Sequence, residues 1–135
     1  MATKIFVNLP VKDLKKSIEF FSALGYTFNP QFTDETAASV IIGGNIFAML
    51  LTHDKWKMFS SKPIVDANKS SEVIIALGVD SKAEVNRIAD AAVKAGGKET
   101  RPPADYGFMQ QRVFDDLDGH HWEVIYMDPA HVQAY

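Results

Sequence analysis

One order of structural signals occurs twice in this chain, and this repetition constrains its fold more than any other feature. Asp13 stands directly before apolar residues at helical spacing, and Ser81 does the same in the second half. A glycine follows each apolar pattern. Aspartate and serine cap the free amides of a first helical turn, and glycine favours the left-handed conformation just past a helix end. The sequence therefore predicts two helices, over about 14–24 and about 82–95.

Short β-rich runs surround each predicted helix. They are expected over about 4–9, 26–32, 37–42 and 45–52 in the first half, and over about 72–79, 98–101, 108–114 and 121–127 in the second. We expect Pro10 to end the first run, and Gly43-Gly44 and Asp118-Gly119 to form hairpin turns. Each half then reads βαβββ. The predicted fold is α+β, with two βαβββ modules that form a curved mixed sheet around a cavity and both helices on its outer face.

The length of the chain favours a single domain. Its 135 residues can bury a core of their own, with about 1–60 as the first module and about 71–135 as the second. The segment SSKPIVDANKS, at 60–70, loses apolar periodicity and carries turn-forming residues. We therefore expect the hinge between the two modules there.

Composition excludes several classes of function. The net charge is −3 and no run of Lys or Arg is present, so the chain lacks the basic surface that grips a nucleic-acid backbone. The count of zero cysteines excludes disulfides, thiolate metal sites and a cysteine nucleophile. The sequence shows no long apolar segment, so we expect no membrane insertion and a cytoplasmic location.

Three segments carry a resemblance to a known family: FVNLPVKDLKKSIEFFSALGYTF at the start, VIIALGVD before the second helix and DDLDGHHWEVIYMD at the end. They resemble the vicinal oxygen chelate superfamily, which holds glyoxalase I, extradiol dioxygenases and bleomycin-resistance proteins. The resemblance covers essentially the whole chain, which looks most like bacterial proteins labelled as predicted lactoylglutathione lyases. It implies a pocket for a small molecule and a homodimer.

The resemblance also implies where a metal ion would bind. Metal-dependent members place His, Glu or Gln ligands on four strands, and the matching positions here are Phe6, Met49 or Leu51, Ile74 and Glu123. Only Glu123 can ligate an ion, whereas a catalytic metal typically needs three protein ligands. We therefore expect no metal in the family's usual position. A weakly held divalent ion between His121 and Glu123, which share a strand face, is the alternative.

Glu123 is the candidate catalytic residue. It lies in an apolar strand and alternates with Trp122 and Val124, whose bulk belongs under the helices, so its carboxylate should face the cavity. Among hydrocarbon neighbours we expect desolvation to raise its pKa, which suits a general base. Replacement by Gln should then leave stability equal or slightly higher while it reduces ligand binding or turnover. The alternative is a structural role, with hydrogen bonds accepted from Asn8, Gln111 or Tyr106.

Six further residues are candidates for ligand contact: Phe6, Asn8, Met49, Ile74, Gln111 and His121. Asn8 shares the strand face of Phe6, although an amide at a strand end can also cap nearby backbone. Gln111 has the parity to present its amide to a bound oxygen, or else to face water at an edge. His121 is expected at the mouth of the cavity.

Two functions follow from these candidates. The first is a glyoxalase-like lyase or isomerase, such as a lactoylglutathione lyase, which acts on a small oxygenated molecule with Glu123 as base. The second is a protein that binds or sequesters a small compound without catalysis, as bleomycin-resistance proteins do. In both cases the expected partner is a small molecule rather than nucleic acid or a membrane.

Overall fold

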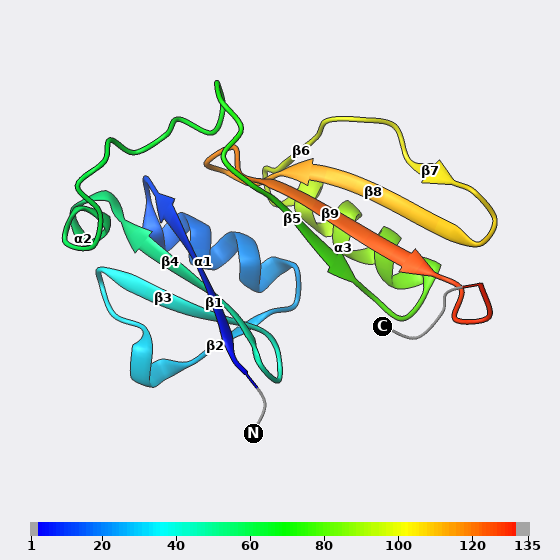
Figure 1. Ribbon diagram of the computed structural model, residues 1–135, viewed down its shortest axis with the longest axis horizontal. Helices are drawn as coiled ribbons and strands as arrows, with labels where there is room; N and C mark the ends of the chain where they lie inside the picture. The colour runs from blue at the N-terminus through cyan, green and yellow to red at the C-terminus, as the bar shows by residue number, and fades with distance from the viewer. Residues whose placement is uncertain (1–2, 132–135) are drawn as a thin grey trace. The chain divides into compact units, whose positions relative to one another are not determined.

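The computed structural model describes residues 3–131, which divide into two compact units with a boundary between Asp66 and Ala67. Each unit has one sheet and one long helix (Figure 1). The fold class is α+β, as predicted. Within the described residues, every helix is too short or too polar to cross a bilayer.

The first unit contains a four-stranded sheet. Its elements, in chain order, are β1 (Ile5–Val11), α1 (Leu14–Ala23), β2 (Thr27–Phe28), the short 3₁₀ helix η1 (Pro30–Phe32), β3 (Ala37–Gly43), β4 (Ile46–Thr52) and α2 (His53–Lys57). The strands lie in the order β1-β4-β3-β2, with β1 parallel to β4 and the other pairs antiparallel.

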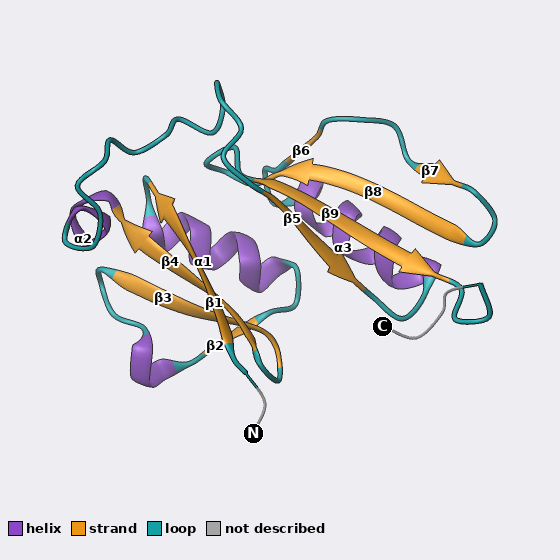
Figure 2. Ribbon diagram, in the orientation of Figure 1, coloured by secondary structure: helices purple, strands orange, loops and turns teal. Residues whose placement is uncertain are grey.

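Helix α1 covers one face of this sheet (Figure 2). The Asp13 side chain accepts a hydrogen bond from the Lys16 amide at 3.1 Å, which confirms the predicted N-cap. Phe20 and Phe21 of the helix are buried, and so is Leu50 on β4. Because side chains alternate along a strand, the opposite face carries the neighbours of these core residues. It includes Phe6 and Asn8 on β1, and Phe47 and Met49 on β4.

The second unit contains a five-stranded sheet. Its elements are β5 (Ile74–Gly78), α3 (Lys82–Lys94), β6 (Lys98–Glu99), β7 (Ala104–Asp105), β8 (Met109–Asp115) and β9 (His121–Met127). The strand order is β5-β9-β8-β6, with β7 paired to β8, and β5 lies parallel to β9.

Helix α3 packs on one face of the second sheet through its apolar side. The Ser81 hydroxyl accepts a hydrogen bond from the Glu84 amide at 3.1 Å, so the second predicted N-cap is confirmed as well. On β9, Trp122 and Val124 are buried in contact with this helix layer, as their parity predicts. Glu123 therefore points to the face that α3 leaves uncovered.

A buried arginine fixes the helix side of the same sheet. Arg112 on β8 donates two hydrogen bonds to Glu99 at 2.9 Å and a third to Asp90 of α3 at 2.7 Å. These acids raise the pKa of the Arg112 guanidinium above its ordinary value, and the hydrogen bonds that Arg112 donates to Glu99 are the largest cause. The charge-assisted hydrogen bonds of Arg112 thus connect β8 to α3 and to β6.

The strand predictions are partly wrong in two places. β1 continues through Pro10 to Val11, because β1 lies at the edge of the first unit's sheet, where a missing amide breaks no ladder. The segment 26–32 is extended only over Thr27–Phe28, because Pro30 opens η1 and the Asn29 side chain accepts from the Gln31 amide at 3.0 Å. The sequence also gives no signal for β7, which has two residues.

Candidate functional site

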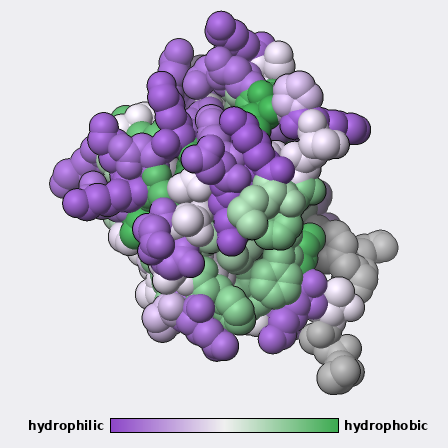
Figure 3. Space-filling model, turned by 90° about the vertical axis from the view of Figure 1, so that its left-hand side faces the viewer, coloured by the Kyte–Doolittle hydropathy of each residue, from purple (hydrophilic) through white to green (hydrophobic). Residues whose placement is uncertain are grey.

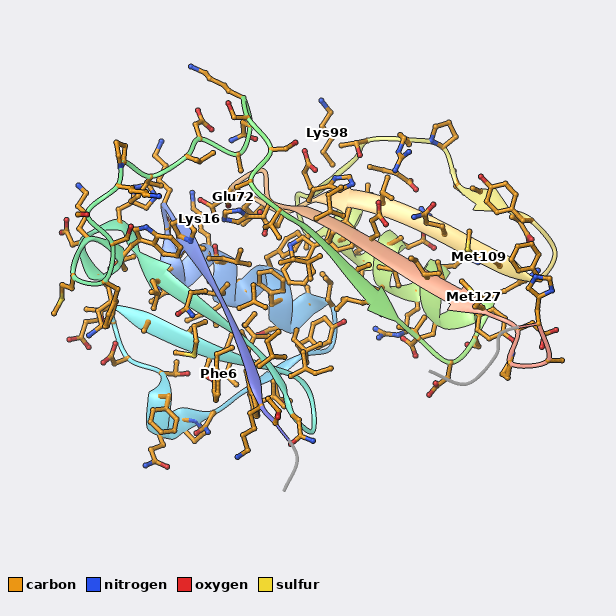
Figure 4. The ribbon with its side chains drawn as sticks, in the orientation of Figure 1. Phe6, Lys16, Glu72, Lys98, Met109 and Met127 are labelled. Carbon is orange, nitrogen blue, oxygen red and sulfur yellow. The ribbon has the colours of Figure 1, made fainter. Side chains whose placement is uncertain are left out.

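The candidate site lies on the face of the second sheet that is turned away from α3, called the open face below. Strand register brings its side chains together, since Asp115 pairs with His121 and Val113 with Glu123 across the β8–β9 hairpin. Gln111 is one further step along the same face of β8. The site lies toward the end of the hairpin marked by Glu72 and Lys98, away from the Met109–Met127 pair (Figure 4).

Glu123 lies in a network of polar partners. Gln111 Nε2 donates to its Oε1 at 2.9 Å. Its Oε2 is 3.6 Å from the Arg101 guanidinium and 3.8 Å from His121 Nε2. The expectation of a carboxylate without counter-charge among hydrocarbon neighbours is therefore wrong, because Arg101 reaches it from the segment after β6. The hydrogen bond from Gln111 is one of those that the structural alternative names.

His121 is oriented by a second carboxylate. Its Nδ1 lies 3.0 Å from Asp115 Oδ1, and because a carboxylate oxygen accepts, Nδ1 carries the proton of this hydrogen bond. The other ring nitrogen then faces Glu123. The preceding His120 is only 2% exposed and lies 2.9 Å from Glu72. The two histidines thus occupy different environments, as their alternation along the chain predicts.

Two pockets border this polar cluster, which consists of Arg101, Gln111, Asp115, His121 and Glu123. The first has a volume of about 330 Å³, and its lining includes Glu72, Ile74, Thr100, Arg101, Asp115 and His121. The second has a volume of about 200 Å³ and is lined by Arg101, Pro102, Ala104, Tyr106, Gln111 and Val113. Arg101 lies between the two and borders both. Hydrogen-bond donors and acceptors therefore converge on space that a small molecule can fill.

The remaining predicted ligand contacts divide between the two units. Ile74 is exposed, pairs with His121 across β5 and β9, and lines the first pocket. In the first unit, Phe6 is exposed and its ring stacks on Phe47 with centroids 5.0 Å apart. The Asn8 amide donates to the Phe6 carbonyl at 3.2 Å, which is the backbone-capping role, and Met49 pairs with Asn8 across β1 and β4.

The residues do not fit the metal site that the resemblance implies. The matched positions in the first unit, Phe6 and Met49, and Ile74 in the second offer a ring, a thioether and a hydrocarbon where nitrogen or oxygen is required. At Glu123, the Arg101 guanidinium at 3.6 Å competes with any cation for the same oxygen. Binding and proton transfer at this site therefore rest on the side chains of the chain itself.

A separate group of possible metal ligands, Asp116, Asp118 and His120, serves the turn before β9. Their ligand atoms lie within 4.8 Å of one another. The Asp116 carboxylate, however, accepts from the amides of Asp118 and His120 at 3.0 Å and from the Trp122 indole at 2.9 Å. Burial raises the pKa of Asp116 to about 6, against the opposing effects of His120 and the Trp122 hydrogen bond. This arrangement is structural.

The sequence reasoning missed Arg101 and Asp115. A parity argument finds Asp115, because it stands opposite His121 in the predicted hairpin. Arg101 lies 22 positions before Glu123 in a segment without periodicity, so nothing in the pattern joins them.

Comparison with solved structures identifies the fold as glyoxalase-like. A hypothetical protein of S. aureus is 30% identical, with a TM-score of 0.77 over 93% of this chain and 95% of that chain. A glyoxalase/bleomycin resistance protein/dioxygenase family enzyme of Burkholderia phytofirmans is 16% identical, with a TM-score of 0.76 over 93% and 99%. The fosfomycin resistance protein FosX of Mesorhizobium loti is 17% identical, with a TM-score of 0.69 over 96% of each chain.

The sequence comparisons point the same way. The family described as bleomycin resistance protein-like N-terminal matches residues 3–43. No curated protein matches the sequence. The chain belongs to the vicinal oxygen chelate superfamily of glyoxalases, bleomycin-resistance proteins and dioxygenases.

Proposed function

We propose that this protein binds a small oxygenated molecule on the open face of the second sheet, without the metal ion of the superfamily's metal-dependent members. The observation that carries the proposal is the position of Arg101. Its side chain is 63% exposed, borders both pockets and pairs with Glu123 at 3.6 Å. A ligand oxygen can approach the guanidinium more closely than that, since charge-assisted hydrogen bonds favour about 2.7–2.9 Å.

The roles of the other cluster residues follow from their chemistry. The amide of Gln111 supplies a donor beside Arg101, and Glu123 and Asp115 supply acceptors. His121 presents its Nε2 to the site, because its Nδ1 is bonded to Asp115. Ile74 gives the first pocket an apolar wall. Such a mixture of a few fixed polar groups with an apolar wall suits recognition of a small molecule.

The comparisons suggest which probes to use first. The family that matches residues 3–43 is described as bleomycin resistance-like, and a structural neighbour is a fosfomycin resistance protein. We would titrate bleomycin and fosfomycin by calorimetry into metal-stripped protein. The proposal expects saturable binding of at least one of them. Loss of the Arg101 contact should weaken it about tenfold or more, since a hydrogen bond to a charged group contributes about 1.5–3 kcal/mol.

Two variants distinguish loss of the specific Arg101 contact from loss of one positive charge elsewhere on the surface. Arg101→Gln should show the loss, whereas Arg87→Gln is the matched control, because Arg87 is an exposed arginine of the same unit that pairs with Glu84 on α3. Equal affinity in wild type and Arg101→Gln, or the same loss in both variants, would refute the proposal. So would a failure of both probes to bind.

A second candidate function is a lyase or isomerase. It is favoured by the hydrogen bond between Asp115 and His121, which fixes the ring so that Nε2 faces Glu123 at 3.8 Å. In that case Glu123 is the base and His121 the group that exchanges the proton with it. Formation of lactoylglutathione that is abolished in Glu123→Gln would favour this candidate, and retained ligand binding without turnover would favour the first.

We also propose a homodimer that works in the cytoplasm, as the resemblance and the composition lead us to expect. Sedimentation of the purified protein tests the first part, since a dimer has twice the mass of the 15.0 kDa chain. Fractionation of the producing cells tests the second.

A further inference from the structure

We infer that a pocket in the first unit, beside α2, binds a planar aromatic molecule. This pocket has a volume of about 340 Å³ and is lined by Asn8, Leu51, Trp56, Phe59 and Ser60. The inference does not rest on the proposed function, because all its residues belong to the first unit.

The short helix α2 builds the wall of this pocket. It follows β4 directly, and the Thr52 hydroxyl caps it by accepting from the Lys55 amide at 3.2 Å. Trp56 lies in α2 and Phe59 is the second residue after this helix, and both line the pocket. The amides of Phe59 and Ser60 both donate to the Trp56 carbonyl, at 2.9 and 3.1 Å, which holds the turn closed. These backbone hydrogen bonds fix the main chain from which both aromatic side chains extend.

The floor of the pocket comes from the face of the sheet that α1 leaves uncovered. Leu51 of β4 is buried there, and Asn8 of β1 contributes an amide at the border. Leu51 supplies hydrocarbon, whereas Asn8 and the Ser60 hydroxyl supply the polar groups. A mainly apolar and aromatic lining with a few polar groups is typical of small-molecule pockets, and the volume is at the lower end of their range of roughly 300–1,000 Å³.

Phe59 leaves a large apolar surface in contact with water. The residue is 72% exposed, and the next residue toward α2, Met58, is exposed as well. On the first unit, apolar side chains gather in one area bordered by polar ones (Figure 3). A flat ring placed against Trp56 and Phe59 would remove this apolar surface from water and gain stacking contacts.

The charges on α2 favour a small molecule over a protein surface. Lys55 and Lys57 both belong to this helix, and the Lys55 amine lies 5.9 Å from the centre of the Phe59 ring. Lysine is depleted at the cores of protein interfaces. An aromatic ligand with a hydroxyl group can instead stack on the rings and direct its oxygen to the polar border.

Fluorine NMR of protein labelled with fluorotryptophan tests the inference, because the chain has two tryptophans. Trp56 lines the pocket, whereas Trp122 is 1% exposed in the second unit. With naphthol as the probe, the Trp56 resonance should shift saturably while the Trp122 resonance stays in place. Decahydronaphthol, which has the same carbon skeleton but is not planar, should bind several-fold more weakly.

Two variants make the test specific. Phe59→Leu should weaken naphthol about fivefold, because aromatic pairs contribute about 0.5–1.5 kcal/mol beyond their area. Phe32→Leu is the control, since Phe32 is an exposed aromatic residue of the same unit outside the lining. The inference is overturned if the Trp56 resonance does not shift, if both alcohols bind equally, or if Phe59→Leu has no more effect than the control. A Trp56 shift that depends on protein concentration alone would assign the pocket to a second copy of the chain and overturn it too.

Discussion

Replacement of Glu123 by Gln is the most informative single change to the stability of the second unit. The main contacts of this carboxylate are a short hydrogen bond from Gln111 at 2.9 Å and a longer ion pair with Arg101 at 3.6 Å. The sequence alone predicts equal or slightly higher stability for Glu123→Gln. The observed contacts predict a loss.

The size of the loss follows from these two contacts. A hydrogen bond to a charged acceptor contributes about 1 kcal/mol more than one to a neutral amide. The ion pair adds less than about 1 kcal/mol, because Arg101 is mostly exposed and solvent screens the pair. We therefore expect Glu123→Gln to lower the free energy of unfolding by about 1–2 kcal/mol. A carboxylate with a 15% exposed side chain has little water to replace these contacts.

Urea unfolding of wild type and variant measures this difference, with Glu84→Gln as a matched control. Glu84 is a partly exposed glutamate of the same unit, and it pairs with Arg87 on α3. The control should lose less than about 0.5 kcal/mol. A double-mutant cycle of Glu123→Gln with Gln111→Leu should return a coupling of about 1 kcal/mol. Unchanged or higher stability of Glu123→Gln, with zero coupling, would refute the reasoning.

Three further predictions concern the stability of the second unit, each measured by urea unfolding. Gly119→Ala should cost about 2 kcal/mol, because φ is +86° and an added Cβ would lie 2.5 Å from Asn68 Oδ1; Gly44→Ala, with open space around it, is the control. Arg112→Met should cost about 3 kcal/mol, since it leaves acids without their counter-charge; an unchanged midpoint contradicts this. Burial raises the pKa of the Asp116 carboxyl to about 6, so its protonated form stabilises the folded state. This stabilisation is complete below the ordinary pKa of aspartate and is lost as the pH rises through the pKa of the folded state. Relative to Asp116→Asn, wild type should therefore lose up to about 3 kcal/mol between about pH 4 and 7, and a constant difference would contradict it.

The elements that local chemistry specifies could be predicted from the sequence. The caps at Asp13 and Ser81 and the apolar spacing behind them define both long helices. Alternation of apolar residues defines β9, whose observed bounds, His121–Met127, are those predicted. The predicted end of β1 at Pro10 was wrong. A proline is tolerated in an edge strand when no neighbouring strand needs its amide, and the position of β1 at the edge is known only from the strand order.

The surroundings of Glu123 could not be predicted, since they depend on contacts between distant segments. The alternation of side chains along β9 predicts the direction of the Glu123 side chain. Arg101, however, belongs to a loop, and the sequence pattern does not predict where a loop runs. Arg112 shows the same limit. A charged residue in a strand is usually exposed, but Arg112 is buried. Glu99 of β6 and Asp90 of α3 pair with it there.

The metal content of the purified protein shows most directly whether this member of the superfamily works without the usual metal ion. Protein purified without chelators would be analysed for zinc and nickel per chain, beside Glu123→Gln. We expect well below one ion per chain in both, because three of the four matched positions offer no suitable ligand atom. One tightly held ion per chain in the wild type, lost in Glu123→Gln, would contradict it.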